Sequence, residues 1–135
     1  MRLIPLLLIA ASLMAQDVEV WMERGIGLFR DANFLEAIRA FERAVAADPN
    51  SVRAHQYLGT SYMQAFIPME QSPENLVFAD SARREFLRVL ELDSGNTLAM
   101  ASLGTLFLNQ KKWDEAQAWF EKLVATEPDN ADAYY

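Results

Sequence analysis

The sequence contains no cysteine and only one histidine, His55. The chain therefore has no disulfide bridge and no thiol nucleophile, and a single imidazole is available as a base. It also has no glycine-rich phosphate loop. Acidic residues gather near positions 17–23 and 127–132, but neither group has the ligand spacing of a calcium loop. We therefore expect a protein that is not an enzyme and that has no catalytic residue, metal site or cofactor.

Basic residues are scarce, with 12 Lys and Arg against 19 Asp and Glu, so the formal net charge is -7. Phosphate binding relies on clustered Lys and Arg, so this balance argues against a nucleic-acid partner. It also argues against attraction to anionic lipid, and solubility is the simplest reason for the charge. With 52% hydrophobic residues, the chain can still bury a continuous core.

Long apolar runs are absent except at the start, where residues 3–14 follow Arg2 and precede Ala15. This run has about 12 residues, against the roughly 20 needed to cross a bilayer. The pattern is typical of a secretory signal peptide over residues 1–15, removed before Gln16. We therefore expect an extracytoplasmic protein, periplasmic or secreted, without stable membrane insertion after removal of the signal. The alternative is an N-terminal helix that packs on the residues that follow.

Three blocks of the sequence share small, aromatic and proline positions at a period of 34 residues. The matching residues are Gly25, Gly59 and Gly104; Ala37, Ala82 and Ala116; Phe41, Phe86 and Phe120; Pro49, Ser94 and Pro128. Intervals that cross the middle block, such as Phe41 to Phe86, are 45 residues, so this block carries 11 extra residues. A period in this range indicates stacked structural repeats. The small residues allow two helices to approach closely, and proline ends the second helix.

This pattern resembles the tetratricopeptide repeat (TPR), a helix–turn–helix unit of 34 residues. The resemblance divides the array into repeats at 18–51, 52–96 with the insertion, and 97–130, and into the start of a fourth at 131–135. It implies an all-α fold over residues 16–135, with helix–turn–helix repeats stacked as a right-handed α-solenoid. It also implies a scaffold for protein–protein interaction. An alternative is the N-terminal TPR portion of a longer protein, whose activity lies beyond residue 135.

Local signals predict where several helices begin. The first helix is expected over 18–30, and Asn33 with Glu36 forms a capping box for the second, which ends near Ala47. Asn50 or Ser51 caps the third helix and Asn96 the fifth, while Asn130 caps whatever follows.

The insertion lies around residues 65–80. Ser72 and Pro73 predict a linker over 67–71 and then a lengthened helix over 73–92. Its first turns carry three apolar residues, Leu76, Val77 and Phe78. We favour their folding back on neighbouring helices over the alternative of a docking ridge.

Two further expectations concern packing. His55 stands at position 4 of its repeat, where side chains of this family pack between helices, so a structural imidazole is expected. The third repeat is expected to leave Trp119, Leu123 and Val124 partly uncovered, because a next repeat normally shields that side. Self-association through this open end is one consequence.

The resemblance also implies a peptide groove, lined by positions 2, 5, 9 and 12 of the first helix of each repeat. Those residues are Glu19, Met22, Ile26 and Phe29; Arg53, Gln56, Thr60 and Met63; Leu98, Ala101, Thr105 and Leu108. The Lys and Asn residues by which some relatives hold a terminal carboxylate are missing. The candidate groove is apolar and is expected to bind a protein or peptide with apolar anchors. Its alternative occupant is the chain's own continuation. The nine residues chosen as candidates are Met22, Ile26, Phe29, Gln56, Thr60, Met63, Ala101, Thr105 and Leu108.

Overall fold

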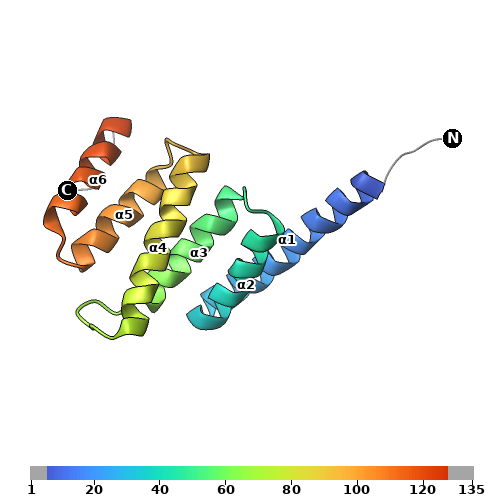
Figure 1. The fold of residues 1–135 in the computed structure, drawn as a ribbon, viewed down its shortest axis with the longest axis horizontal. Helices are drawn as coiled ribbons and strands as arrows, with labels where there is room; N and C mark the ends of the chain where they lie inside the picture. The colour runs from blue at the N-terminus through green and yellow to red at the C-terminus, as the bar shows by residue number, and fades with distance from the viewer. Residues whose placement is uncertain (1–5, 128–135) are drawn as a thin grey trace.

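The computed structural model describes residues 6–127, with side chains at Ala15 and from Asp17 onwards. Within these residues there are six helices and no strand. They are α1 (Leu6–Arg30), α2 (Phe34–Ala47), α3 (Val52–Ala65), α4 (Pro73–Leu92), α5 (Thr97–Asn109) and α6 (Trp113–Thr126). Consecutive helices form three hairpins, stacked in chain order (Figure 1). The expected all-α repeat solenoid is confirmed.

The first helix is longer than the sequence signals predicted. It begins at Leu6 rather than near Val18 and runs without a break to Arg30. Residues 6–17 contain neither glycine nor proline and are rich in Leu and Ala, so nothing ends the helix between the apolar run and the first repeat. The start of α1 extends past the rest of the array (Figure 1). None of the helices in residues 6–127 is long and apolar enough to cross a membrane.

The repeating glycines allow the two helices of each hairpin to touch. A Cβ atom added to Gly25 would lie 2.4 Å from Cε1 of Phe41, and one added to Gly104 would lie 2.6 Å from Cε1 of Phe120. The same contact in the middle repeat, between Gly59 and Phe86, is looser at 3.0 Å. The Phe rings therefore occupy the space that larger side chains would need.

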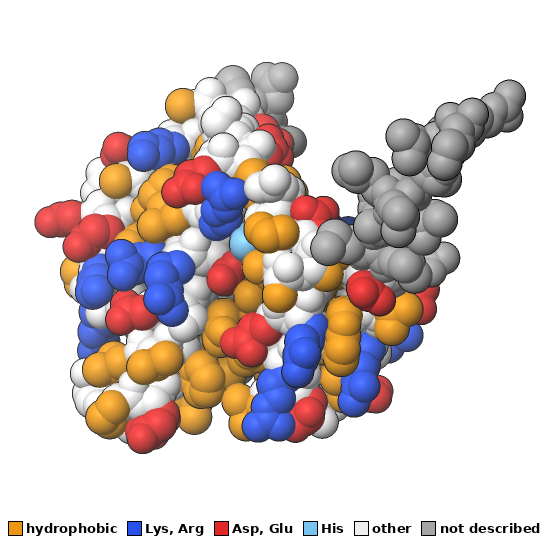
Figure 2. Space-filling view, turned by 45° about the vertical axis from the view of Figure 1, so that its right-hand side comes forward, with side chains coloured by type: hydrophobic (Ala, Val, Ile, Leu, Met, Phe, Trp, Pro, Cys, Tyr) orange, Lys and Arg blue, Asp and Glu red, His pale blue; other side chains and the backbone are white. Residues whose placement is uncertain are grey.

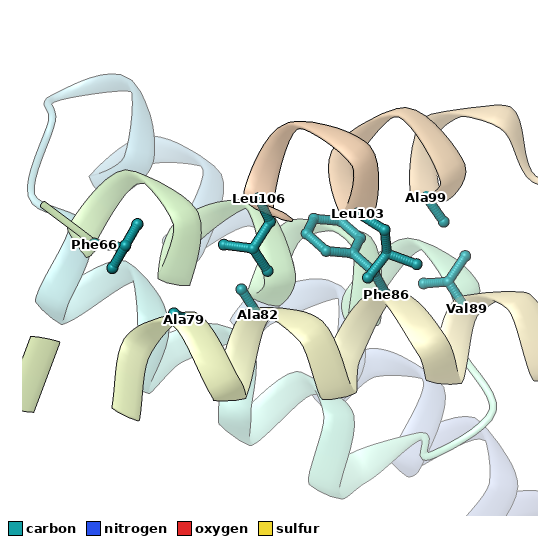
Figure 3. Packing of buried hydrophobic residues seen from close by; sticks show 8 residues of the cluster. All are labelled: Phe66, Ala79, Ala82, Phe86, Val89, Ala99, Leu103 and Leu106. Carbon is teal, nitrogen blue, oxygen red and sulfur yellow. The ribbon is translucent and has the colours of Figure 1, made fainter. Parts of the chain in front are cut away.

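Two apolar clusters fill the array. The first joins α1, α2 and α3 around Met22, Phe41 and Leu58. The second joins α4 to α5, with Phe86 pointing toward Leu103 and Leu106 (Figure 3). Each cluster spans a boundary between repeats, so each repeat depends on its neighbour for burial.

The turns after α1 and α5 share one geometry. Ala32 and Lys111 both have φ 58°, the left-handed conformation. The amide of Asn33 donates to the Leu28 carbonyl, and the amide of Lys112 donates to the Phe107 carbonyl, the six-residue bond of a Schellman motif. These bonds satisfy backbone carbonyls at the helix end. Glycine is the more usual residue at the left-handed position that Ala32 and Lys111 occupy.

This turn overturns the predicted capping box. The Asn33 side chain makes no capping hydrogen bond, and Glu36 instead pairs with Arg39 at 2.7 Å. The reason is that Asn33 belongs to the Schellman motif, where its ψ of 72° differs from the more extended values of the true caps. Those caps are Ser51, Ser72 and Asn96, whose side chains all accept a backbone hydrogen bond. Asn130 lies outside the described residues.

The insertion is an ordered loop followed by a lengthened helix, and α4 begins at Pro73 as predicted. Asn75, only 3% exposed, holds the loop in place. Its Oδ1 accepts from the Ile67 amide at 2.7 Å, and its Nδ2 donates to the carbonyls of Ile67 and Glu70 at 2.7 and 2.8 Å. One buried amide thus satisfies three backbone groups of the loop.

The third hairpin differs from the expectation at one residue. Trp119 and Val124 are half-buried, but Leu123 is fully buried at 0% exposure, so the prediction that it is partly uncovered was wrong. Position 123 lies on the side of α6 that faces α5, at the spacing of Ala116 and Phe120. It therefore packs within its own repeat and needs no further repeat to cover it.

Candidate functional site

A hollow of about 260 Å³ lies where the first helices of the three repeats meet. Its walls come from α1 (Phe29), α3 (Gln56, Tyr57 and Thr60) and α5 (Leu98). Helix α3 contacts both α1 and α5 across the stacked hairpins. The hollow therefore belongs to the stacked array and not to any single repeat.

Aromatic contacts hold the apolar wall of the hollow. The Tyr57 ring stacks on the Phe41 ring, with ring centres 5.2 Å apart. The Phe29 ring packs edge-on against Tyr57, with ring centres 6.5 Å apart. Phe29 also packs edge-on against Phe34 at 5.3 Å. Because Phe41 is fully buried, Tyr57 rests on a fixed support. Such a wall is preorganised, so little side-chain freedom is lost on binding.

Gln56 and Thr60 provide the polar groups of the hollow. The Thr60 hydroxyl donates to the backbone carbonyl of Gln56 at 2.8 Å, so its proton is already used. No described residue hydrogen-bonds the Gln56 side-chain amide, which therefore offers both a donor and an acceptor. The Arg53 guanidinium stands 5.8 Å from the ring of Tyr57, which lines the hollow, and 3.7 Å from the Glu19 carboxylate. The hollow suits a largely apolar group flanked by an amide.

The structure brings only some of the nine candidate residues together. Phe29, Gln56 and Thr60 line the hollow. Met22 does not, because it is 1% exposed inside the first core cluster, and this part of the sequence-based assignment is corrected. Ile26 and Met63 are half-buried, and pack against the first and second core clusters respectively. Both contribute to the support of the array more than to its surface.

The remaining candidates lie on α5. Ala101 is half-buried and Thr105 is exposed, and neither is among the residues that line the hollow. Leu108 lines a second hollow of about 320 Å³ with residues of α6, among them Trp113 and Phe120. Self-association through this end of the array stays a prediction.

Sequence reasoning missed Tyr57 as a wall of the hollow. It follows Gln56 directly and lies at position 6 of its repeat, outside the four positions that the resemblance implied. An aromatic residue beside a groove position was the available signal. Leu98 was among the implied groove positions and does line the hollow, although it was not chosen as a candidate.

His55 has a structural role, as its position predicted. It is 5% exposed, with Nδ1 2.5 Å from the Glu85 carboxylate and Nε2 2.7 Å from the Pro49 carbonyl. Both partners are acceptors, and only the imidazolium can donate to both at once. The hydrogen bond to Glu85 raises the pKa of His55, against the opposing effect of burial. His55 thereby ties α3 to α4 and to the turn before α3. Among the described residues, no group of acidic or histidine side chains could hold a metal ion.

This contact predicts a pH dependence of stability. Because the folded pKa of His55 lies above its ordinary value of 6.5, its stabilisation is complete below pH 6.5 and is lost as pH rises through the folded pKa. We expect the urea midpoint of the wild type to fall over that range, and that of Glu85→Gln to change less. Urea titrations of both proteins between pH 5.5 and 9 would measure this. Parallel pH profiles would contradict the assignment.

The sequence was compared with protein-family models and with known proteins. The sequence model of a family described as tetratricopeptide repeat matches residues 18–51, and a second with the same description matches residues 79–135. DnaJ homolog subfamily C member 3 of Bos taurus is 30% identical over 83% of this chain and 20% of its own length. The chain spans about a fifth of the length of the curated relatives it matches.

Solved structures share the fold. The TPR domain of Arabidopsis OM64 superposes with a TM-score of 0.74 at 17% identity, covering 90% of this chain and 93% of that domain. The second TPR domain of human RPAP3, solved in complex with an HSP70 peptide, gives 0.71 at 22% identity, covering 92% and 93%. This likeness confirms the fold. The two family matches, which cover residues 18–51 and 79–135, show that the chain belongs to the tetratricopeptide repeat family.

Proposed function

We propose that this protein is an exported scaffold that holds an apolar segment of a protein partner in the hollow between α1, α3 and α5. The observation that carries the proposal is the meeting of Phe29, Gln56, Tyr57, Thr60 and Leu98 at one hollow. An apolar side chain of the partner packs against Phe29, Tyr57 and Leu98. The Gln56 amide, with one donor and one acceptor side, pairs with the partner's backbone.

The hollow has little positive charge, so we expect its partner segment to differ from the acidic peptide bound by a solved relative. The HSP70 peptide in the RPAP3 complex described above, SGPTIEEVD, ends in Glu-Glu-Val-Asp and so carries three acidic side chains near its terminus. In this chain the twelve groove positions include one cation, Arg53, and its guanidinium already lies near Glu19. A carboxylate placed here gains little attraction. We therefore infer that the bound segment is apolar and that an acidic terminus is not its anchor.

Phe29→Glu is expected to weaken capture of the partner by at least about tenfold, because it sets a charge against the apolar wall. The control is Leu35→Glu, which alters an exposed residue of α2 outside the hollow. Pull-downs from an extracytoplasmic extract with wild type and both variants, quantified by mass spectrometry, test the proposal. Helicity by circular dichroism should be unchanged in both variants. Equal capture of every partner by Phe29→Glu and wild type would show that the hollow does not bind the partner.

Export is part of the proposal and has its own test. The apolar residues 3–14 before Ala15 and Gln16 support removal of a signal peptide. Mass spectrometry of the protein from its native host is expected to find a mature chain that starts at or near Gln16. A cytoplasmic protein with an intact Met1 would contradict export and leave the groove proposal standing.

A further inference from the structure

Four large apolar side chains stand exposed on the insertion of the middle repeat. Ile67, Met69, Leu76 and Val77 are 58%, 65%, 40% and 57% exposed, and we call them the insertion ridge. Of Leu76, Val77 and Phe78, only Phe78 packs inward, where its ring lies 6.4 Å from that of Tyr62. Folding back, the arrangement favoured from sequence, therefore holds for Phe78 and not for Leu76 or Val77. In the space-filling view of Figure 2, apolar side chains form exposed patches between charged side chains.

The ridge is held in a fixed shape. The three hydrogen bonds of the buried Asn75 side chain tie Ile67 and Glu70 to the start of α4. The Glu70 amide donates to the Ile67 carbonyl at 3.3 Å, which closes a turn with Pro68 and Met69 at its centre. Met69 has φ 75°, a conformation in which a turn normally carries glycine. A bulky apolar residue therefore occupies a position where the backbone favours glycine, and its side chain points to solvent.

The charged residues of the insertion itself have one sign. Between Phe66 and Ala82 the chain carries Glu70, Glu74 and Asp80 and no lysine or arginine. Asp80 lies 3.5 Å from Arg83, whereas Glu70 and Glu74 form no ion pair with any described residue. An apolar strip with unpaired carboxylates beside it is complementary to an apolar strip flanked by cations.

We propose that the insertion ridge is a second docking surface, which binds a basic amphipathic segment of a protein partner. The partner's apolar side chains cover Ile67, Met69, Leu76 and Val77, while its Lys or Arg residues face Glu70 and Glu74. A protein segment fits better than a membrane, because these carboxylates repel anionic lipid headgroups. The fixed loop lowers the ordering cost of binding. This surface lies outside the hollow proposed above and does not depend on it.

A display experiment identifies such a segment without knowledge of the natural partner. A library of random 20-residue peptides is selected on the wild-type chain and counter-selected on Met69→Gly. This variant removes the most exposed ridge side chain and suits the positive φ, so it is expected to fold at least as stably as wild type. Enrichment of peptides with an apolar stripe and an excess of Lys and Arg supports the proposal. Enrichment of acidic peptides, or of no common pattern, overturns it.

Affinities of a selected peptide then locate its binding site. Val77→Ser and the double change Glu70→Lys with Glu74→Lys are each expected to weaken binding by at least about fivefold. Val20→Ser, on an equally exposed valine of α1, and Phe29→Glu, in the hollow, should bind like wild type. Equal losses in Val77→Ser and Val20→Ser would overturn the ridge as the binding site. Binding of wild type to phosphatidylcholine vesicles, with loss in Met69→Gly, would replace the protein partner by a lipid surface.

Discussion

Asn75→Ala is expected to lower the free energy of unfolding by about 2–4 kcal/mol, since each buried polar group left without a partner costs about 1–3 kcal/mol. The substitution removes the partner of the Ile67 amide and of the carbonyls of Ile67 and Glu70. Part of that cost is recovered as water reaches the loosened loop. Urea unfolding followed by circular dichroism would measure the change, and limited proteolysis should show new cleavage within residues 66–72.

The matched control is Asn33→Ala, which removes the same side chain where it makes no capping bond. Its expected effect is within about 0.5 kcal/mol. A similar loss of stability in both variants would show that Asn75 does not hold the insertion. The comparison also bears on the ridge, because the exposed positions of Ile67 and Met69 depend on the same three hydrogen bonds.

Gly25→Ala and Gly27→Ala are expected to change stability in opposite directions. An added methyl at Gly25 would lie 2.4 Å from the Phe41 ring, which is fully buried and stacked on Tyr57, so it has no free space to enter. Overpacking of this kind costs about 1–3 kcal/mol. At Gly27 nothing lies within 4 Å of the added methyl, and alanine should stabilise the helix by up to about 1 kcal/mol.

Thermal or urea midpoints of the two variants against wild type decide this prediction. Gly25→Ala should also weaken partner binding, because a shift of Phe41 displaces Tyr57 from the wall of the hollow. Midpoints that rise together would mean that the Gly–Phe contacts do not set the spacing of the helices. The same pair of measurements therefore tests the repeat alignment and the support of the candidate site.

Several features of the fold could be predicted because their signals are local. The start of α4 follows from a capping serine directly before proline, and this pair needs no distant partner. The period of 34 residues predicted that small residues recur where two helices approach closely, and the structure places Gly25, Gly59 and Gly104 at such contacts.

Other features depend on contacts that the sequence does not display. Asn33 and Ser51 both precede a helix, but the Schellman turn around Ala32 takes Asn33 away from the capping geometry. Asn75 binds backbone atoms five and eight residues earlier, a relation set by the path of the loop. Met22 was assigned to the groove by its position in the repeat, although α2 and α3 bury it. Family positions therefore located the correct helices, and packing decided which side chains reach the surface.

An apolar segment of a partner is the proposed occupant of the hollow between α1, α3 and α5. The most direct test is a nuclear magnetic resonance titration of the isotope-labelled chain with the partner segment found by capture. The largest shifts are expected at the amides of Phe29, Gln56, Tyr57, Thr60 and Leu98, and the Gln56 side-chain amide is expected to shift clearly. Largest shifts on α6 or on the outer face of α2, with the Gln56 amide unmoved, would contradict this proposal.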